Sequence, residues 1–351
     1  MTVHPENALA VNRWTRAHSR PGLACSWAGW AWVWLQLVSA GLARPESKRL
    51  KAIERRLRAA RPSNLPGVLG GSGGEAVVAT LAGSVEPSLA HLVTPAMERL
   101  ETALHACRVS EFTYGCAGAV MAFAEIESLR PNTVRRSLAD VAFRHVERAL
   151  AVALEPGTVV CLGLAHGVAG HLLALETGRA VFGLRFHPSI RERSLSLLAS
   201  SRLTSAHGSF WSNDTGTESI HIHGWCSGSP GIGLACLLGE RLSGDRAYAS
   251  IWREALEATA GSWFGPFDFC CGVLGRAQIL LETFRLTGRP IWRRRSVAAL
   301  KRPRVPPPHG KRDLFYGNLG RLYLELRSRE LRLPLPGLGP FSVVQRERGG
   351  K

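Results

Sequence analysis

The sequence lacks the motifs by which most nucleic-acid-binding proteins are identified. Its 351 residues contain no zinc-finger spacing, no RNP motif and no platform of interleaved aromatic and basic side chains. Acidic residues are also scarce, because 27 Asp and Glu stand against 44 Lys and Arg, and the net charge is +17. Such an excess favours an acidic partner. With nucleic acid disfavoured, an acidic peptide, an anionic membrane surface or simply an arginine-rich solvated exterior remains.

A disulfide framework is missing as well, although the chain contains eight cysteines. Their spacing is unlike that of small secreted domains, which favours a reducing compartment such as the cytoplasm. Five of them lie in apolar helix or turn sequence and are expected to be core thiols: Cys25, Cys107, Cys116, Cys161 and Cys236. The other three, Cys226, Cys270 and Cys271, stand at glycine turns.

Charge is absent from one long stretch, Gly22–Ala43, which carries four tryptophans. A run of this length can span a bilayer, and because arginines precede it, it also resembles a signal peptide. However, Arg44 and Lys48 follow it, and it is rich in small residues. We therefore expect a buried outer or capping helix here, with membrane association as the alternative.

Glycine turns recur along the chain and organise it. Their first glycines fall at residues 71, 115, 167, 228, 272 and 317, so that the gaps are 44, 52, 61, 44 and 45 residues. This is the length of a two-helix repeat. A short apolar run such as Ala119–Ala124 or His171–Leu175 follows each turn, and a helix that is apolar all round is buried all round.

Longer amphipathic segments alternate with these apolar runs, and no segment shows the period-2 alternation of a sheet. The pattern predicts an all-α protein, a six-fold α,α-toroid in which inner and outer helices alternate. An open solenoid is the alternative. We expect the toroid to occupy residues 62–332, with residues 1–61 packed on it as a polar lead, an apolar helix and a basic helix. Residues 333–351 are expected to form a flexible tail.

Three connecting segments stand out by composition. Ser47–Arg61 is strongly basic with one apolar stripe, as expected for a solvated outer helix or a docking surface for an acidic peptide. Thr177–His223 is the longest insertion and is rich in serine near its end, which suggests a mobile flap over a site. Arg302–Pro308 is proline-rich and basic, as in a linker loop.

Candidate metal ligands occupy matching positions in three turns. Cys226 and Cys270 stand two residues before the first glycine, and Cys271 and His166 stand one residue before it. Equivalent positions in a rotationally repeated fold converge, so these side chains should meet at the mouth of the ring. Three thiolates suit tetrahedral zinc, and a site with three protein ligands keeps one position open for catalysis. The alternative is two core thiols and a chance Cys-Cys pair.

The motifs LGLAHGVAG, GWCSGSPGIG, FCCGVLG and LFYGNLG, in this order, resemble those of the lanthionine synthetase C-like family. The resemblance covers about residues 62–332. It implies an α,α-toroid with one zinc ion per chain that activates a peptide cysteine thiol. The thiolate then adds to a dehydroalanine or dehydrobutyrine of the same peptide and forms a thioether ring.

The resemblance also implies roles for individual residues. Cys226 and Cys270 match the first two zinc ligands, and Cys271 stands where most members have a histidine. His166 matches the active-site histidine, and Glu111 falls where the family usually has an aspartate.

One position departs from the family pattern. An arginine often stands four residues before the first zinc cysteine, and here this position is Ile222, between His221 and His223. Either histidine is a candidate substitute for the missing cation, and a solvated loop histidine is the alternative for each.

A cyclase of this kind needs partners. The resemblance implies a dehydrated precursor peptide, with a leader segment that is often acidic, and a separate dehydratase, because no dehydratase-sized region is present. Two other functions are open. The chain either adds a small thiol such as glutathione to an activated alkene, or binds peptide without catalysis.

Overall fold

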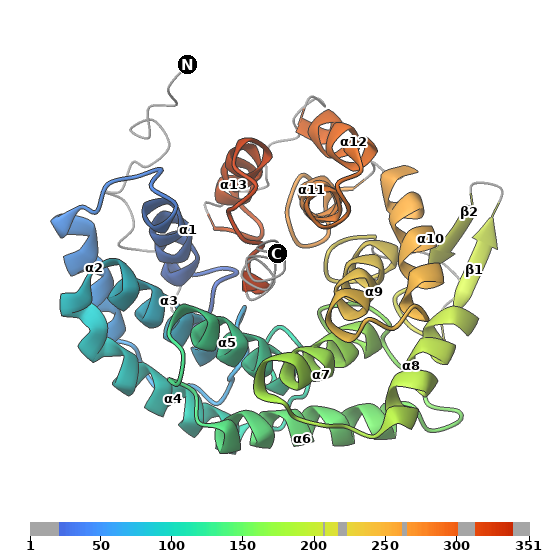
Figure 1. The fold of residues 1–351 in the computed structure, drawn as a ribbon, viewed down its shortest axis with the longest axis horizontal. Helices are drawn as coiled ribbons and strands as arrows, with labels where there is room; N and C mark the ends of the chain where they lie inside the picture. Colours follow the sequence, from blue (N-terminus) through green and yellow to red (C-terminus); the bar gives the residue numbers. More distant parts are fainter. Residues whose placement is uncertain (1–20, 206–207, 217–222, 262–264, 301–312, 340–351) are drawn as a thin grey trace.

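The structure, a computed structural model, describes residues 21–205, 208–216, 223–261, 265–300 and 313–339. Helices dominate these residues, arranged as two concentric rings (Figure 1). The inner ring contains α1 (Trp27–Ser39), α3 (Ser72–Val85), α5 (Cys116–Leu129), α7 (Val168–Phe182), α9 (Ser229–Ser243), α11 (Val273–Thr287) and α13 (Asn318–Arg329). The outer ring contains α2 (Ser47–Arg58), α4 (Val93–Ala106), α6 (Arg136–Ala153), α8 (Pro188–Ser200), α10 (Tyr248–Gly261) and α12 (Pro290–Leu300). A 3₁₀ helix, Pro87–Leu92, precedes α4.

The glycine turns allow each inner helix to pack tightly on the chain that leads into it. A Cβ atom at Gly170 would lie 1.9 Å from the carbonyl oxygen of Leu164, six residues earlier. The same contact recurs at 1.9 Å between Gly275 and Phe269. Such distances leave no room for any side chain, so glycine is required wherever the turn folds back on itself.

Backbone hydrogen bonds connect one turn to the next around the whole ring. The series runs Ala24 N to Leu69 O (2.9 Å), Gly70 N to Thr113 O (2.8 Å), Phe112 N to Ala165 O (3.0 Å), Ala165 N to Cys226 O (2.9 Å), Cys226 N to Cys270 O (3.2 Å), Phe269 N to Phe315 O (2.8 Å) and Phe315 N to Ala24 O (3.1 Å). The last bond returns to the residue where the series began. The predicted α,α-toroid is therefore confirmed, and the open solenoid is excluded.

The ring contains one unit more than the six glycine turns predict. Residues 22–29 form a turn of the same kind, in which a Cβ at Gly29 would lie 2.2 Å from the oxygen of Leu23. This turn leads into α1, which is buried as expected but belongs to the inner ring (Figure 1), not to the outer layer or a cap. Ser26 stands where the other turns have their first glycine, which hid the repeat. No helix among the described residues is long and apolar enough to cross a membrane.

The chain does not leave the fold at residue 333. Leu333, Leu335 and Leu338 are each at most 2% exposed, so the prediction of a flexible tail is wrong for residues 333–339. The Tyr323 hydroxyl donates to the oxygen of Pro334 (2.7 Å), and Arg327 donates to that of Leu333 (2.9 Å). The prediction for residues 340–351 falls outside the described part of the chain.

The expected insertion at Thr177–His223 turns out to contain ordinary elements of the ring. It holds the end of α7, the outer helix α8 and a two-stranded hairpin, β1 (Arg202–Ser205) with β2 (Gly208–Trp211), which the sequence did not predict. Trp211 fixes this hairpin, because its indole donates to the oxygen of Leu198 (2.6 Å) and its backbone to the Ser229 hydroxyl (3.1 Å). The described residues therefore give no mobile flap. Residues 217–222 and the loop Arg302–Pro308 lie outside them.

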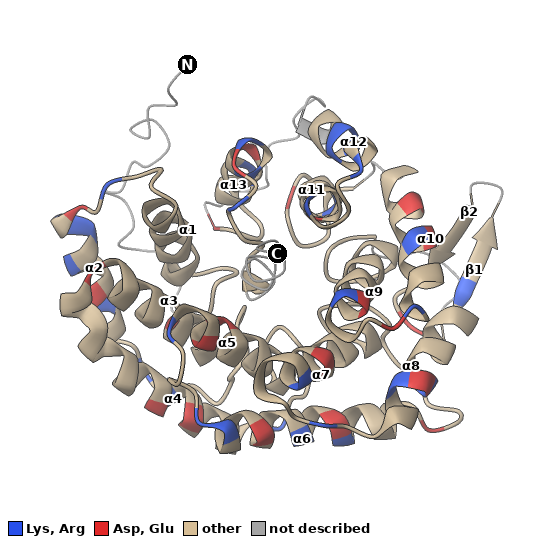
Figure 2. Ribbon diagram, viewed as in Figure 1, with Lys and Arg blue, Asp and Glu red and all other residues tan. Residues whose placement is uncertain are grey.

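Charged residues occur in helices of both rings, and α2 is one of the outer helices that carry several of them (Figure 2). The predicted basic helix is α2, which buries Leu50, Ile53 and Leu57 and carries its lysines and arginines on its other faces. The prediction of a core thiol is wrong for Cys161, which is exposed. It lies in the loop before α7, where its backbone forms an isolated antiparallel bridge with Asp214.

Candidate metal centre

Three thiols meet at the end of the ring where the inner helices begin. Cys226 precedes α9, and Cys270 and Cys271 precede α11. The sulfur of Cys271 lies 3.3 Å from that of Cys226 and 3.6 Å from that of Cys270, and all three lie within 4.8 Å of one another. Tetrahedral zinc with bonds of about 2.3 Å requires sulfur atoms about 3.8 Å apart. The cluster is thus able to hold a metal ion after small adjustments.

Neighbouring turns hold these cysteines in place. The Asp268 carboxylate accepts a hydrogen bond from the backbone nitrogen of Cys271 (2.9 Å). A Cβ at Gly224 would lie 2.4 Å from Cys271 Cα, so only glycine permits the two turns to approach so closely. Arg276, buried beneath them, donates to the backbone oxygen of His223.

The thiols share their protons unequally. Hydrogen bonds from Cys226 and Cys271 lower the pKa of Cys270 to about 4, despite its burial. The same hydrogen bond to Cys270 raises the pKa of Cys226, and burial raises it further. A thiol whose anionic form is favoured in this way is a better ligand for a metal cation.

A cavity of about 450 Å³ opens beside the thiols. Its wall is mostly apolar and is drawn from turns all around the ring. Lining residues include Cys25, Leu69, Val109, Tyr114, His166, Trp225, Cys226, Cys270, Phe315 and Tyr316. Cys25 is therefore a half-buried residue of the cavity wall, not the core thiol predicted.

His166 and Glu111 form a hydrogen-bonded pair at this cavity. Nδ1 of His166 lies 2.7 Å from Oε2 of Glu111, and the His166 side chain is 49% exposed. The Glu111 carboxylate is held rigidly, because it also accepts hydrogen bonds from the backbone nitrogens of Thr113 (2.9 Å) and Tyr114 (2.6 Å). This carboxylate places the proton of neutral His166 on Nδ1 and leaves Nε2 able to exchange one.

The remaining predicted residues do not join this group. His223 is buried, is absent from the cavity wall, and has its pKa lowered to about 3 by burial and by Arg276. It is neutral at physiological pH and offers no cation. His221 and Ile222 lie outside the described residues.

Sequence reasoning missed three residues that occupy the same register as His166. Cys25, Tyr114 and Tyr316 each stand four residues before the second glycine of their turn, as do His166 and Cys271. All three line the cavity. The signal was present in the spacing, but tyrosine is a common packing residue and the turn of Cys25 was unrecognised.

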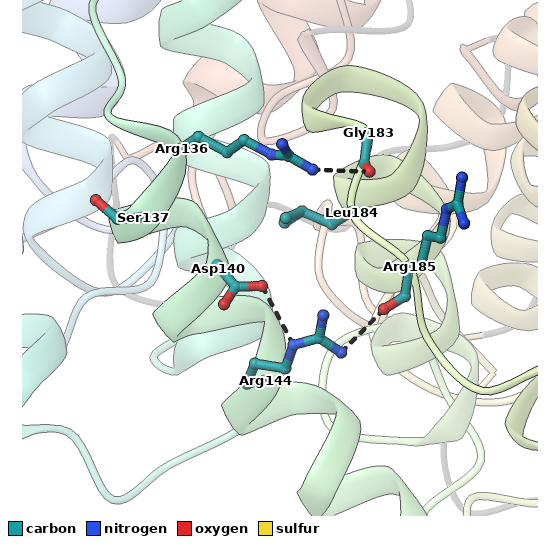
Figure 3. A pocket seen from close by; sticks show the side chains of 7 residues that line it. All are labelled: Arg136, Ser137, Asp140, Arg144, Gly183, Leu184 and Arg185. Atoms are coloured by element: carbon teal, nitrogen blue, oxygen red, sulfur yellow. Dashed lines mark hydrogen bonds and ion pairs between the residues drawn. The ribbon is translucent and has the colours of Figure 1, made fainter.

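A second cavity, of about 590 Å³, lies between α6 and the segment that follows α7 (Figure 3). Arg136 donates to the oxygen of Gly183 (3.1 Å), while Arg144 donates to Asp140 (3.2 Å) and to the oxygen of Arg185 (2.9 Å). These bonds tie an outer helix to the end of an inner one. Because α7 begins beside His166 and ends at Phe182, this cavity is at the opposite end of the ring from the thiols.

Solved structures of other proteins include one with a similar fold. A solved structure titled "Nisin cyclase" matches with a TM-score of 0.70 and 14% sequence identity over 94% of each chain, and at this identity the likeness concerns the fold. No curated protein matches the sequence. A family model described as "Lanthionine synthetase C-like protein" matches residues 43–302, well over half of the chain. The chain belongs to the lanthionine synthetase C-like family.

Proposed function

We propose that the protein is a zinc-dependent lanthipeptide cyclase, which adds peptide cysteine thiols to dehydroalanine or dehydrobutyrine and so forms thioether rings. One observation carries the proposal: two members of the thiol cluster, Cys226 and Cys270, line the same cavity as His166, which Glu111 holds by a hydrogen bond. The family is the one in which this chemistry is expected.

Cys226, Cys270 and Cys271 would hold the zinc ion. When bound, the ion supplies a positive charge that lowers the pKa of a peptide thiol beside it. Two of the three cysteines, Cys226 and Cys270, line the cavity, so a peptide that enters it would come close to an ion held there. The apolar wall of Leu69, Trp225 and Phe315 would exclude water from the reacting atoms.

His166 would move the proton. Addition of sulfur to the β-carbon forms a C–S bond and leaves negative charge on the α-carbon and its carbonyl, and a proton must then reach the α-carbon. Nε2 of His166 is the group able to deliver it, after taking the proton that the thiol released. Glu111 would hold the ring in position and stabilise its cationic form while it carries that proton.

The substrate would be a dehydrated precursor peptide supplied by a separate dehydratase. An acidic leader would suit the basic helix α2 and the net charge of +17. A reducing compartment such as the cytoplasm would keep the three thiols available for zinc.

The test measures zinc and ring formation together. Purified wild-type protein, reduced and loaded with zinc, should carry about one ion per chain, and Cys226→Ala should carry none. Wild type with a dehydrated, cysteine-containing peptide should give a product of unchanged mass that no longer reacts with a thiol reagent, and Cys226→Ala should not. A zinc-loaded wild type that captures several such peptides without closing a ring would overturn the cyclase proposal in favour of a peptide-binding toroid.

A further inference from the structure

Tyr316 is a polar side chain of the cavity wall to which the proposed reaction gives no role. It is 37% exposed and lines the same wall as His166, Cys226 and Cys270. Its position in the turn matches that of His166 and Cys271, four residues before the second glycine. The fold thus presents its phenol ring to the cavity at the same level as the catalytic groups.

The turn that contains Tyr316 is hydrogen-bonded directly to the turn that contains Cys270 and Cys271. The backbone nitrogens of Phe269 and Cys270 both donate to the oxygen of Phe315, at 2.8 and 3.3 Å. The backbone nitrogen of Tyr316 donates to the Asp313 carboxylate (2.6 Å), which fixes the other side of the turn. The two turns are therefore adjacent, and the side chains of Tyr316 and Cys270 line the same cavity wall, which brings the phenol within reach of the Cys270 thiol.

As a zinc ligand, Cys270 must bind the ion without reacting with the substrate itself. A zinc ion held by three thiolates carries a net negative charge, which leaves each ligand sulfur nucleophilic. Cys270 also lines the cavity that would receive a dehydrated peptide. If its sulfur attacked the β-carbon of a dehydro residue, a C–S bond would form at the expense of the C=C bond, the α-carbon would take up a proton, and the enzyme would be alkylated.

We propose that Tyr316 is a positioning residue that donates its hydroxyl hydrogen to the sulfur of Cys270, keeping Cys270 on the zinc ion and suppressing its attack on the substrate. A hydrogen bond to a ligand sulfur draws electron density from it, and such partners of metal ligands control both affinity and reactivity. The inference rests on the zinc site of the proposed function and adds a residue to it.

The experiment compares Tyr316→Phe with wild type and with Tyr114→Phe. Both substitutions remove one hydroxyl at the same register of the cavity, but Tyr114 belongs to the turn that carries Glu111. Each full-length, zinc-loaded protein is treated with iodoacetamide, and alkylation at Cys270 and Cys226 is followed by peptide mass spectrometry. Zinc affinity is measured in parallel by competition with a chromogenic chelator, and thermal melting verifies that each variant is folded.

We expect Tyr316→Phe to bind zinc about 10-fold more weakly and to be alkylated at Cys270 about 10-fold faster. Tyr114→Phe should match wild type in both measurements. Wild-type zinc affinity and alkylation rate in a folded Tyr316→Phe would overturn the inference and leave the proposed function intact. A wild-type protein that binds no zinc would overturn the zinc site itself, and this inference with it.

Discussion

The first prediction concerns His166 and Glu111, which we propose act together in proton transfer. Glu111→Gln keeps the shape of the side chain and an oxygen for one of the two backbone donors, but replaces the carboxylate that holds His166 Nδ1 at 2.7 Å. We expect zinc to be retained and ring closure to slow about 100-fold, as it should in His166→Asn, since proton transfer of this kind contributes on that order. The measurement is the rate of thiol loss from a dehydrated peptide, with zinc content determined on the same samples.

The double variant gives the decisive comparison at this pair. If Glu111 acts only through His166, Glu111→Gln combined with His166→Asn should be no slower than His166→Asn alone. Losses that multiply in the double variant would mean that the two side chains act independently, and the proposed proton transfer would then be wrong.

Residue identities at the site were partly predictable because the fold is repetitive. The register of Cys226, Cys270 and Cys271 predicted that they would converge, and the sulfur atoms indeed lie within 4.8 Å of one another. His223 could not be judged in this way, because it is buried and its backbone accepts a hydrogen bond from Arg276, which lies on the helix of a different turn. Spacing indicates which side chains share a level of the ring, but not which of them the neighbouring turns cover.

At the scale of the element, the glycine turn is the unit whose packing can be tested. Gly170→Ala would place a Cβ 1.9 Å from the oxygen of Leu164, a contact with backbone that no side-chain rotation relieves. We expect it to destabilise the protein by roughly 1–3 kcal/mol or more. Gly261→Ala is the matched control, since no described atom lies within 4 Å of its Cβ. Its effect in urea unfolding should stay within about 0.5 kcal/mol of wild type. Equal stability of the two variants would contradict the packing argument.

Elements outside the turns were harder to predict from sequence. The basic stripe of α2 followed the ordinary periodicity of an amphipathic helix and was predictable. The hairpin was not, because β1 and β2 are only four residues each and depend on the burial of Trp211 against Leu198. Short strands fixed by one distant side chain leave no periodic signal in the sequence.

At the scale of the whole molecule, closure of the ring depends on both ends of the described chain. The backbone nitrogen of Phe315 donates a hydrogen bond to the oxygen of Ala24. The helices α1 and α13 are neighbours where the ring closes (Figure 1). The rings of Trp32 and Tyr323 meet edge to face across this junction, with centroids 5.4 Å apart. The sequence predicted a toroid but divided it incorrectly, because Ser26 hid the first unit and the proline-rich composition after residue 332 suggested a tail.

The segment after α13 should therefore contribute to stability. Leu333→Ala combined with Leu338→Ala removes two buried side chains, and Gly337, between them, packs against Leu69 and Val68. Each leucine deletion in a packed core costs about 2–5 kcal/mol, so we expect the free energy of unfolding to fall by roughly 4 kcal/mol or more. Arg332→Ala is the control in the same segment, because its pair with Glu330 is exposed and is screened by solvent, so its loss should have little effect on stability. Urea unfolding followed by tryptophan fluorescence measures all three proteins. A double variant within about 1 kcal/mol of wild type would show that the ring closes without this segment and that its leucines are buried without stabilising the fold.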